Sequence, residues 1–248
     1  MTVDVGDGIA TITLDSVANR NALSGRLVAQ LLEAIEGASA HPAVHALLIT
    51  ANGSVFCSGA DLSDPPSNER GTSFSYPDVL HAIISCPKPV VAKVSGHARA
   101  GGLGLIAACD IAIAPADVNF AFSEVRLGLV PAIIAVVCRR VMDVRAFSRL
   151  ALVGESFDAA EAVRSGLLTK AVARDEFDRE LAALIEELHR TEPNAVATTK
   201  RLLDDLGAMT LADGFTHAAR ISASAFDSAE GREGIAAFRE KRPPTWAW

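Results

Sequence analysis

The sequence predicts an α/β domain followed by a helical C-terminal region. Short apolar runs with strand character alternate with helix-like stretches up to about residue 131, and beyond that point the strand signal fades. Alternating strands and helices are typical of α/β domains. We therefore expect an α/β core over residues 1–190 and a helical region over residues 191–248.

Several stretches in the first part of the chain have the apolar periodicity of regular elements. Alternation predicts a strand over residues 8–14, and a stripe of apolar residues predicts a helix over residues 24–39. The next expected elements are a buried strand at 44–50, a helix at 76–86 and a strand at 89–94. Between them, SDPPSNERGTSFSYP (63–77) is rich in Pro, Ser and Gly, which predicts a mobile surface loop or a lid.

The rest of the chain carries two short strand-like runs and then helical patterns. The runs DIAIA (110–114) and VNFAF (118–122) are expected to be strands. In DAAEAVRSG (158–166), Asp158 and Glu161 have the spacing of a capping box, and Gly166 is expected to end that helix. Further helices are expected at 175–190, 194–206, 211–226 and 229–239.

Composition excludes several classes of function. The net charge of -7 argues against nucleic acid as a partner, because the chain has no overall basic field. The four cysteines form no CxxC pair, so we expect reduced, mostly buried thiols. The apolar run at 127–138 is too short to span a bilayer, and the first residues lack the pattern of a signal peptide. We therefore expect a cytoplasmic protein with no membrane span.

The segment ARAGGLGLIAACD (98–110) places three glycines within four residues, and three interpretations are open. Residues 102–107 fit the dinucleotide pattern G-x-G-x-x-A, but the following helix would have to end near Cys109, which is short for such a unit. A plain strand-to-helix turn is a second interpretation. The third is an oxyanion hole, in which free N–H groups at a helix N-terminus hold a substrate oxygen.

An oxyanion hole usually needs a second donor, and VFCSGADLSD (55–64) offers one. It contains a Gly-Ala turn that follows a strand and leads into a polar segment. A simple turn at the end of a strand explains this segment equally well when it is taken alone.

Taken together, these motifs resemble the crotonase superfamily, the enoyl-CoA hydratases and isomerases. The matching pieces occur in family order over nearly the whole chain: RNALS (20–24), FCSGADL (56–62), PKPVVAKVSGHARAGGLGLIAACDIAIA (87–114), SEVRLGLVP (123–131), GESFDAAEAVRSGLL (154–168) and FREKRPP (238–244). The resemblance implies the crotonase (ClpP-like) spiral fold of repeated ββα units. It also implies a C-terminal trimerisation region and a homotrimer or a hexamer formed as a dimer of trimers.

The resemblance also implies the ligand and two site residues. Members of this family bind a coenzyme A thioester, so coenzyme A is part of the substrate and no permanently bound cofactor is expected. The two oxyanion donors would be the backbone N–H groups of Ala60 and Gly101. One donor of this kind contributes about 3–4 kcal/mol to stabilisation of the transition state.

Further residues match the family's stretches that contact coenzyme A. By resemblance, Ala22 and the segment Ala60, Asp61 and Leu62 would line the adenine and pantetheine. Phe238 and Lys241 match the C-terminal F-x-x-K pattern, which often meets the coenzyme A of a neighbouring subunit.

The acid–base residues depart from the hydratase pattern. Hydratases carry one glutamate three residues after the oxyanion glycine and a second twenty residues later, and water addition needs both. Here Gly104 occupies the first position, and Glu124 retains the second. Acid–base catalysis of this kind contributes roughly 10²–10⁴ in rate.

The segment that follows Glu124, which would form a wall of the acyl pocket, also departs from the family pattern. The family often continues with P-G-x-G-G-T, whereas this chain has PAIIAVVCRR (131–140). We expect a dry acyl pocket formed by Ile133, Ile134 and Val137, suited to a long or bulky acyl chain. No acidic or histidine cluster has the spacing of metal ligands, so we predict no metal site.

Two functions remain open at this point. The first is an enoyl-CoA hydratase/isomerase of fatty acid metabolism. Its hydratase activity is in doubt because Gly104 replaces a catalytic glutamate, and a single glutamate suits migration of a double bond. The second is a non-catalytic protein of lipid metabolism that binds or carries long-chain acyl-CoA.

Overall fold

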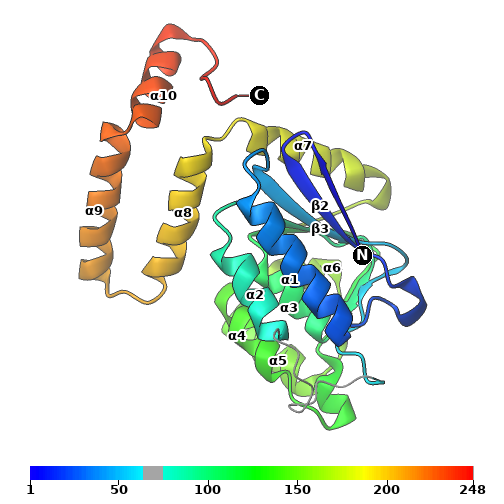
Figure 1. Ribbon diagram of the computed structural model, residues 1–248. Helices are drawn as coiled ribbons and strands as arrows, with labels where there is room; N and C mark the ends of the chain where they lie inside the picture. The colour runs from blue at the N-terminus through cyan, green and yellow to red at the C-terminus, as the bar shows by residue number, and fades with distance from the viewer. Residues whose placement is uncertain (64–74, 248) are drawn as a thin grey trace. The chain divides into compact units, whose positions relative to one another are not determined.

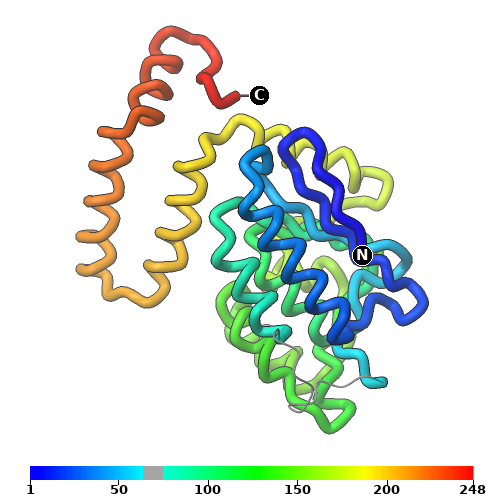
Figure 2. The backbone as a smooth tube through the Cα atoms, in the orientation of Figure 1, coloured from blue at the N-terminus to red at the C-terminus, as the bar shows by residue number. Residues whose placement is uncertain are grey.

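The larger of two β-sheets contains six strands, within the part of the chain described by the computed structural model (residues 1–63 and 75–247). The strand order is β1 (Thr2–Gly6), β2 (Ile9–Leu14), β3 (Ala46–Ala51), β5 (Val90–Lys93), β7 (Ile111–Pro115) and β10 (Lys170–Val172). Strands β1 and β2 form an antiparallel hairpin, and the remaining pairs are parallel. The hairpin is dark blue in Figure 2 and leads into helix α1.

The smaller sheet contains four short strands. Their order is β4 (Val55–Cys57), β6 (His97–Arg99), β8 (Asn119–Ala121) and β9 (Ser156–Asp158). Strands β4, β6 and β8 run parallel, and β9 is antiparallel to β8.

The two sheets are linked by a repeating ββα unit. Strands β3, β5 and β7 belong to the larger sheet, and each is followed by a strand of the smaller sheet and then by a helix. The three helices are α2 (Tyr76–Ser85), α3 (Gly101–Ala108) and α4 (Ala132–Val141) (Figure 1). The repeat is structural: no corresponding repeat is visible in the sequence. It agrees with the architecture that the family resemblance implies.

Helix α1 (Gly25–Ala40) follows from the apolar stripe in its sequence. Ser24 caps its start, with the side-chain oxygen accepting a hydrogen bond from the N–H of Leu27 at 3.3 Å. Leu27, Leu31 and Ile35 are buried on one face, as residues spaced three and four apart should be. The helix predicted over residues 24–39 is confirmed.

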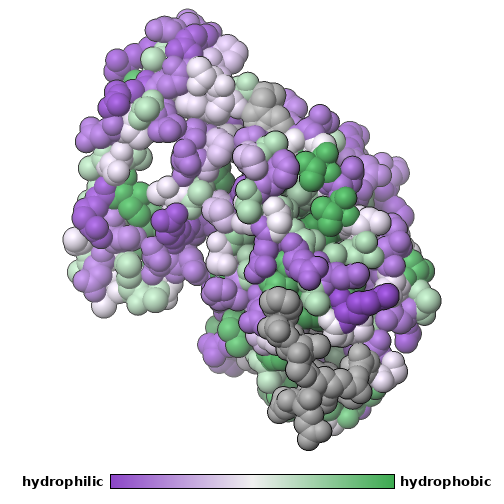
Figure 3. Space-filling view, viewed as in Figure 1, coloured by the Kyte–Doolittle hydropathy of each residue, from purple (hydrophilic) through white to green (hydrophobic). Residues whose placement is uncertain are grey.

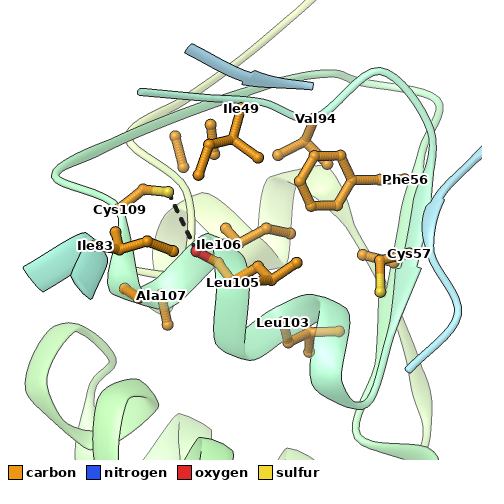
Figure 4. Close-up of a cluster of buried hydrophobic side chains, with 14 of the residues drawn as sticks. Ile49, Phe56, Cys57, Ile83, Val94, Leu103, Leu105, Ile106, Ala107 and Cys109 are labelled. Carbon is orange, nitrogen blue, oxygen red and sulfur yellow. Dashed lines mark hydrogen bonds between the residues drawn. The ribbon is translucent and has the colours of Figure 1, made fainter. Parts of the chain in front are cut away.

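Helix α3 lies inside the core. All eight of its residues are buried. Figure 4 shows Leu103, Leu105 and Ile106 of this helix among buried side chains from other elements, including Phe56 and Val94. The helix ends at Ala108, and the Cys109 thiol donates to the Leu105 carbonyl at 3.2 Å. This two-turn helix is short for the crossover of a dinucleotide-binding unit.

Some elements differ from those expected. Strands β9 and β10 lie beyond residue 131, where the strand signal of the sequence fades; each has only three residues and therefore little periodicity. Strand β1 was also not predicted, although the Asp7–Gly8 pair adopts the left-handed conformation of a two-residue hairpin turn. The loop or lid expected at 63–77 lies largely outside the described residues, and its last two residues open α2.

Among the described residues up to 189, the remaining elements are short 3-10 helices and α-helices. They are η1 (Val17–Asn19), η2 (Ser123–Leu127), η3 (Arg174–Glu176), α5 (Val144–Val153), α6 (Ala159–Arg164) and α7 (Phe177–His189). In α6 the Asp158 carboxylate accepts from the Glu161 N–H at 2.7 Å, so Asp158 caps the helix as predicted.

The chain divides into two compact units, Met1–Leu181 and Ala182–Trp248. The sequence suggested a division at residue 190, near the end of α7. The second unit contains α8 (Pro193–Leu206), α9 (Leu211–Asp227) and α10 (Ala229–Glu240). Within it, Arg242 forms two hydrogen bonds with Glu233, at 2.7 and 2.9 Å, which hold the C-terminal segment against α10.

The visible surface is mainly hydrophilic. Figure 3 shows hydrophilic residues over most of one face, with hydrophobic residues scattered among them. Among the described helices, none combines the length and the apolar character that crossing a bilayer requires.

Candidate active site

Three successive ββα units each contribute one predicted site residue, two or three residues after the unit's strand in the smaller sheet. Ala60 follows β4, Gly101 follows β6 and Glu124 follows β8. The three strands are parallel neighbours, with Cys57 paired to Ala98 and Arg99 paired to Ala121. Their carboxyl ends therefore meet at one edge of the smaller sheet, the edge at which open parallel sheets commonly bind ligands.

Gly101 is the first residue of α3, and its N–H is free. Within the described residues, no acceptor takes a hydrogen bond from this N–H. The preceding residue, Ala100, has φ 48° and ψ -119°, a conformation that a non-glycine residue rarely adopts. The Ala100 N–H donates to the Ala121 carbonyl at 3.0 Å, which fixes this turn to the end of β8.

The Gly59–Ala60 turn lies directly against Gly101. A Cβ atom on Gly101 would be 3.5 Å from the Gly59 Cα and 3.8 Å from the Gly59 carbonyl carbon. Ala60 nitrogen is bonded to that carbonyl carbon, so the two predicted donors are neighbours. Gly59 has φ +92°, and a Cβ there would lie 2.7 Å from the Ala100 Cβ, so this close approach requires glycine.

The Ala60 N–H is also free of an acceptor in the described part of the chain. Its neighbours are held from both sides, because the Leu23 N–H donates to the Gly59 carbonyl at 2.8 Å and the Asp61 N–H donates to the Leu23 carbonyl at 3.4 Å. Two free N–H groups on adjacent, fixed turns have the chemistry of an oxyanion hole.

Asn21 anchors the segment that supports the Ala60 turn. Its side chain is fully buried, accepts from the Ser16 N–H at 2.7 Å, and donates to the carbonyls of Asn52 (3.0 Å) and Val55 (2.8 Å). Asn21 also has φ 54°, a left-handed conformation that asparagine tolerates. The motif RNALS thus has a structural function at this residue that sequence reasoning missed.

Glu124 lies in η2, just beyond β8. Its Oε2 is buried and has no hydrogen-bond partner among the described residues. Burial raises the pKa of its carboxyl above the usual value of 4.5. A carboxylate that has a buried oxygen without a hydrogen-bond partner among the described residues, and a raised pKa, has the properties of a general base.

The space beside Gly104 is occupied by other side chains. A Cβ atom there would lie 2.5 Å from Ile134 Cγ2 and 2.8 Å from the Tyr76 hydroxyl oxygen. The sequence marked Gly104 only as a missing acid. The structure adds that Tyr76 and Ile134 fill the place where the side chain of that acid would begin, and nothing in the sequence pointed to Tyr76.

Helix α4 carries both Ile134, which lies beside Gly104, and Cys138. Cys138 lies one helical turn after Ile134, on the same buried face of α4. The charge of Glu124 raises the pKa of Cys138, although burial raises it more. Ile134, which lies beside Gly104, and Cys138, whose pKa the charge of Glu124 affects, therefore lie on the same face of α4.

The predicted acyl-pocket residues do not share one face of α4. Ile134 and Val137 are buried, with 3% and 2% of their surface exposed, whereas Ile133 is 44% exposed. An inner face made of Ile134, Val137 and Cys138 is dry and apolar.

The residues predicted to contact coenzyme A are distributed over both units. Ala22 is buried, and Leu62 is 64% exposed. The Asp61 carboxylate accepts from the N–H and hydroxyl of Ser63 at 3.0 and 2.6 Å, so it caps that turn. Phe238 and Lys241 belong to α10 and its C-cap in the second unit.

A separate surface groove lies between α1 and α2. Its volume is about 570 Å³, and its lining includes Ile35, Glu36, His81 and Cys86. None of the predicted site residues lines this groove.

The cysteines are free thiols, as predicted. All four are buried, and burial raises the pKa of Cys57 to about 12. The described residues contain no group of three or more His, Cys, Asp or Glu side chains arranged for a metal ion.

Known proteins are similar to this chain in sequence over nearly its whole length. The family model described as enoyl-CoA hydratase/isomerase matches residues 4–247. A Thermus thermophilus protein that carries an enoyl-CoA hydratase name is 35% identical over 244 residues, covering 95% of this chain and 96% of the relative. A Danio rerio protein, enoyl-CoA hydratase domain-containing protein 3, is 30% identical, covering 97% of this chain and 85% of the relative. That relative is named as mitochondrial, so a cytoplasmic location stays a prediction.

Solved structures agree with the sequence relatives. The crystal structure of an enoyl-CoA hydratase from Mycobacterium smegmatis has a TM-score of 0.93 at 32% identity, covering 99% of this chain and 98% of that one. Pseudomonas aeruginosa AtuE has a TM-score of 0.92 at 34% identity, covering 100% and 99%. The chain has the crotonase fold and belongs to the enoyl-CoA hydratase/isomerase family.

Proposed function

We propose that this protein moves the double bond of an enoyl-CoA thioester, with Glu124 as its single acid–base residue. The observation that supports this most strongly is the contrast between Glu124 and Gly104. Glu124 presents a buried, unpartnered oxygen, whereas the place of a second carboxylate is filled by Ile134 and Tyr76.

The proposed reaction begins with a proton at C2 of a 3-enoyl-CoA. Glu124 takes that proton, and the electron pair of the C–H bond delocalises into the thioester to form a dienolate. The N–H groups of Ala60 and Gly101 bind the oxygen as it gains negative charge, each contributing about 3–4 kcal/mol. Glu124 then returns the proton to C4, and a 2-enoyl-CoA results.

Hydration is expected to be slow on the same grounds. Adding water requires a group that orients the water and a group that moves the second proton. Position 104 has no side chain, and the inner face of α4 offers only apolar groups and a thiol. The Tyr76 hydroxyl beside Gly104 already donates its proton to the Gly101 carbonyl. A dry site suits proton transfer within the substrate better than capture of a water molecule.

We also propose that the protein is a homotrimer or a dimer of trimers. Leu211, Phe215 and Phe226 of α9 are exposed, and Phe238 of α10 is 85% exposed. In such an assembly Phe238 and Lys241 would reach the coenzyme A of a neighbouring subunit. Sedimentation that shows a monomer at micromolar concentration would contradict this.

The test compares two substrate series on the wild-type protein. Purified protein is incubated with 3-enoyl-CoA and 2-enoyl-CoA substrates from C4 to C16, and isomerisation and hydration are followed separately. We expect isomerisation to exceed hydration by at least about tenfold, since acid–base help from a second group contributes roughly 10²–10⁴. Efficient hydration would contradict the proposal.

A third outcome would favour a carrier. If neither reaction occurs but a saturated long-chain acyl-CoA binds tightly, the proposed isomerase is contradicted and the protein is an acyl-CoA binding or carrier protein.

A further inference from the structure

We infer that Tyr76 is a positioning residue that holds the first turn of α3, and with it the Gly101 N–H, in the orientation that an enolate oxygen requires. The inference rests on the proposed function of Gly101 as an oxyanion donor. It assigns Tyr76 a function that the sequence did not suggest.

The contact that carries this inference joins Tyr76 to the oxyanion residue itself. The Tyr76 hydroxyl donates to the Gly101 carbonyl at 2.5 Å. Tyr76 therefore holds a carbonyl of the first turn of α3 from outside the helix.

The start of α3 has few other means of support. Its N-cap residue, Ala100, makes no side-chain capping bond, and its first turn contains no acidic residue. Gly101 and Gly102 open the helix, and glycine restricts the backbone least of all residues. The Tyr76 hydrogen bond therefore adds a second fixed point to a turn that is otherwise held by the bond from the Ala100 N–H to the Ala121 carbonyl.

Two hydrogen bonds fix the backbone on either side of the free Gly101 N–H. Before it, the Ala100 N–H is bound to the Ala121 carbonyl; after it, the Gly101 carbonyl is bound to Tyr76. The peptide that carries the free N–H lies between these two fixed points. Preorganised donors are effective because they do not reorganise as charge develops.

Tyr76 is itself held in place. It is the first residue of α2, and the Asp78 carboxylate accepts from the N–H and hydroxyl of Ser75 at 2.6 and 2.7 Å. Burial keeps the pKa of Tyr76 well above its usual value, so the hydroxyl remains protonated and continues to donate. The absence of a side chain at Gly104 leaves room for this hydroxyl.

The test replaces Tyr76 by phenylalanine, which removes only the hydroxyl. The matched control is Thr50→Val, which removes another partly buried hydroxyl that donates to a carbonyl, that of Lys93 at 3.1 Å. Three quantities are measured: kcat and KM with the preferred enoyl-CoA, affinity for a saturated acyl-CoA, and the fraction of bound 3-oxoacyl-CoA that is enolate, from its near-ultraviolet absorbance.

We expect Tyr76→Phe to lower kcat about tenfold, with KM within about twofold, because small misplacements of catalytic groups have effects of this size or larger. The enolate fraction should fall as well, while affinity for the saturated acyl-CoA and all Thr50→Val values stay near wild type. If Tyr76→Phe retains the wild-type kcat and enolate fraction, the inference is overturned. A loss of acyl-CoA affinity with an unchanged enolate fraction also overturns it, in favour of a general structural role.

The wild-type measurement separates the two proposals. If the wild-type protein binds 3-oxoacyl-CoA without forming enolate, the proposed oxyanion hole is contradicted, and so is the role of Tyr76 that depends on it. A wild-type protein that forms enolate, with a Tyr76→Phe variant that forms as much, contradicts only the role of Tyr76.

Discussion

The Tyr76 hydroxyl oxygen lies 2.8 Å from the point that a Cβ atom on Gly104 would occupy. Ile134 Cγ2 lies closer still, at 2.5 Å. The packing of Tyr76 and Ile134 therefore requires glycine at position 104. The same glycine also removes the acid that hydratases carry at this position. A glutamate placed there alone would have to displace both neighbours.

This close packing predicts the effect of Gly104→Ala. We expect it to lower the free energy of unfolding by about 1–3 kcal/mol through overpacking. In the Ile134→Ala background the same substitution should have a smaller effect, because residues in contact couple. Urea unfolding of the wild type, the two single variants and the double variant measures the coupling between the two positions.

The control for that cycle is Gly37→Ala on α1, where a Cβ meets nothing within 4 Å. It should stabilise the protein by about 0.5–1 kcal/mol, as alanine does in a helix interior. Equal effects of the Gly37 and Gly104 substitutions would contradict the packing argument.

Gly101→Ala tests the oxyanion turn. The new Cβ would lie 2.6 Å from Leu23 Cδ1 and would project between the two donor turns. Alanine keeps the backbone N–H, but the displaced turn would misplace it, so we expect kcat to fall by about 10²-fold.

Gly25→Ala is its matched control, because Gly25 is also the first residue of a helix and a Cβ there meets nothing within 4 Å. The steady-state kinetics of both variants are compared. Wild-type kcat in Gly101→Ala would exclude this turn from the site.

Asn21→Ala should be strongly destabilising. It leaves the N–H of Ser16 and the carbonyls of Asn52 and Val55 without their partner and places alanine at a left-handed φ. We expect a loss of about 3 kcal/mol. Asn52→Ala, at an exposed side chain bonded to Asp15, should cost less than about 1 kcal/mol. Similar denaturation midpoints for the two variants would show that Asn21 does not anchor this segment.

The pH dependence follows from Glu124. Burial raises the pKa of its carboxyl above 4.5, and only the ionised form accepts a proton. Activity should therefore rise with pH and level off above a pKa higher than that of a free glutamate. A pH profile of kcat/KM that is flat down to pH 4.5 would contradict this.

The same shift has a consequence for stability. With a raised folded-state pKa, the proton is bound more tightly in the folded protein. Stability is therefore greatest below the unfolded-state pKa and falls as pH rises through the folded-state pKa. Glu124→Gln should consequently raise Tm relative to wild type at pH 7, and the difference should shrink towards pH 4. A difference that grows towards low pH would contradict this account of Glu124.

The sequence predicted those features that depend on local pattern. Apolar periodicity located α1, α2 and the buried strands β3 and β5, and the glycine motifs located the turns at Ala60 and Gly101. Short strands such as β9 and β10 were missed because three residues are too few for a period to show. The ββα repeat was invisible because it is a repeat of topology, not of residues.

Contacts between distant segments could not be predicted in the same way. Tyr76 and Gly104 lie in different helices, and only the fold brings the hydroxyl to the start of α3. The function of Asn21 likewise depends on carbonyls more than thirty residues further along the chain. The sequence placed Ile133 in the acyl pocket with Ile134, but adjacent residues of a helix point about 100° apart.

The central claim is that Glu124 alone moves the proton. The most direct test is exchange of the C2 proton of a bound 3-enoyl-CoA with deuterium from solvent. Wild type, Glu124→Gln and Glu33→Gln are compared, because Glu33 is an exposed carboxylate on α1. We predict that exchange in Glu124→Gln falls by roughly 10²–10⁴ while acyl-CoA still binds, and that Glu33→Gln behaves as wild type. Exchange at the wild-type rate in Glu124→Gln would show that another group is the base.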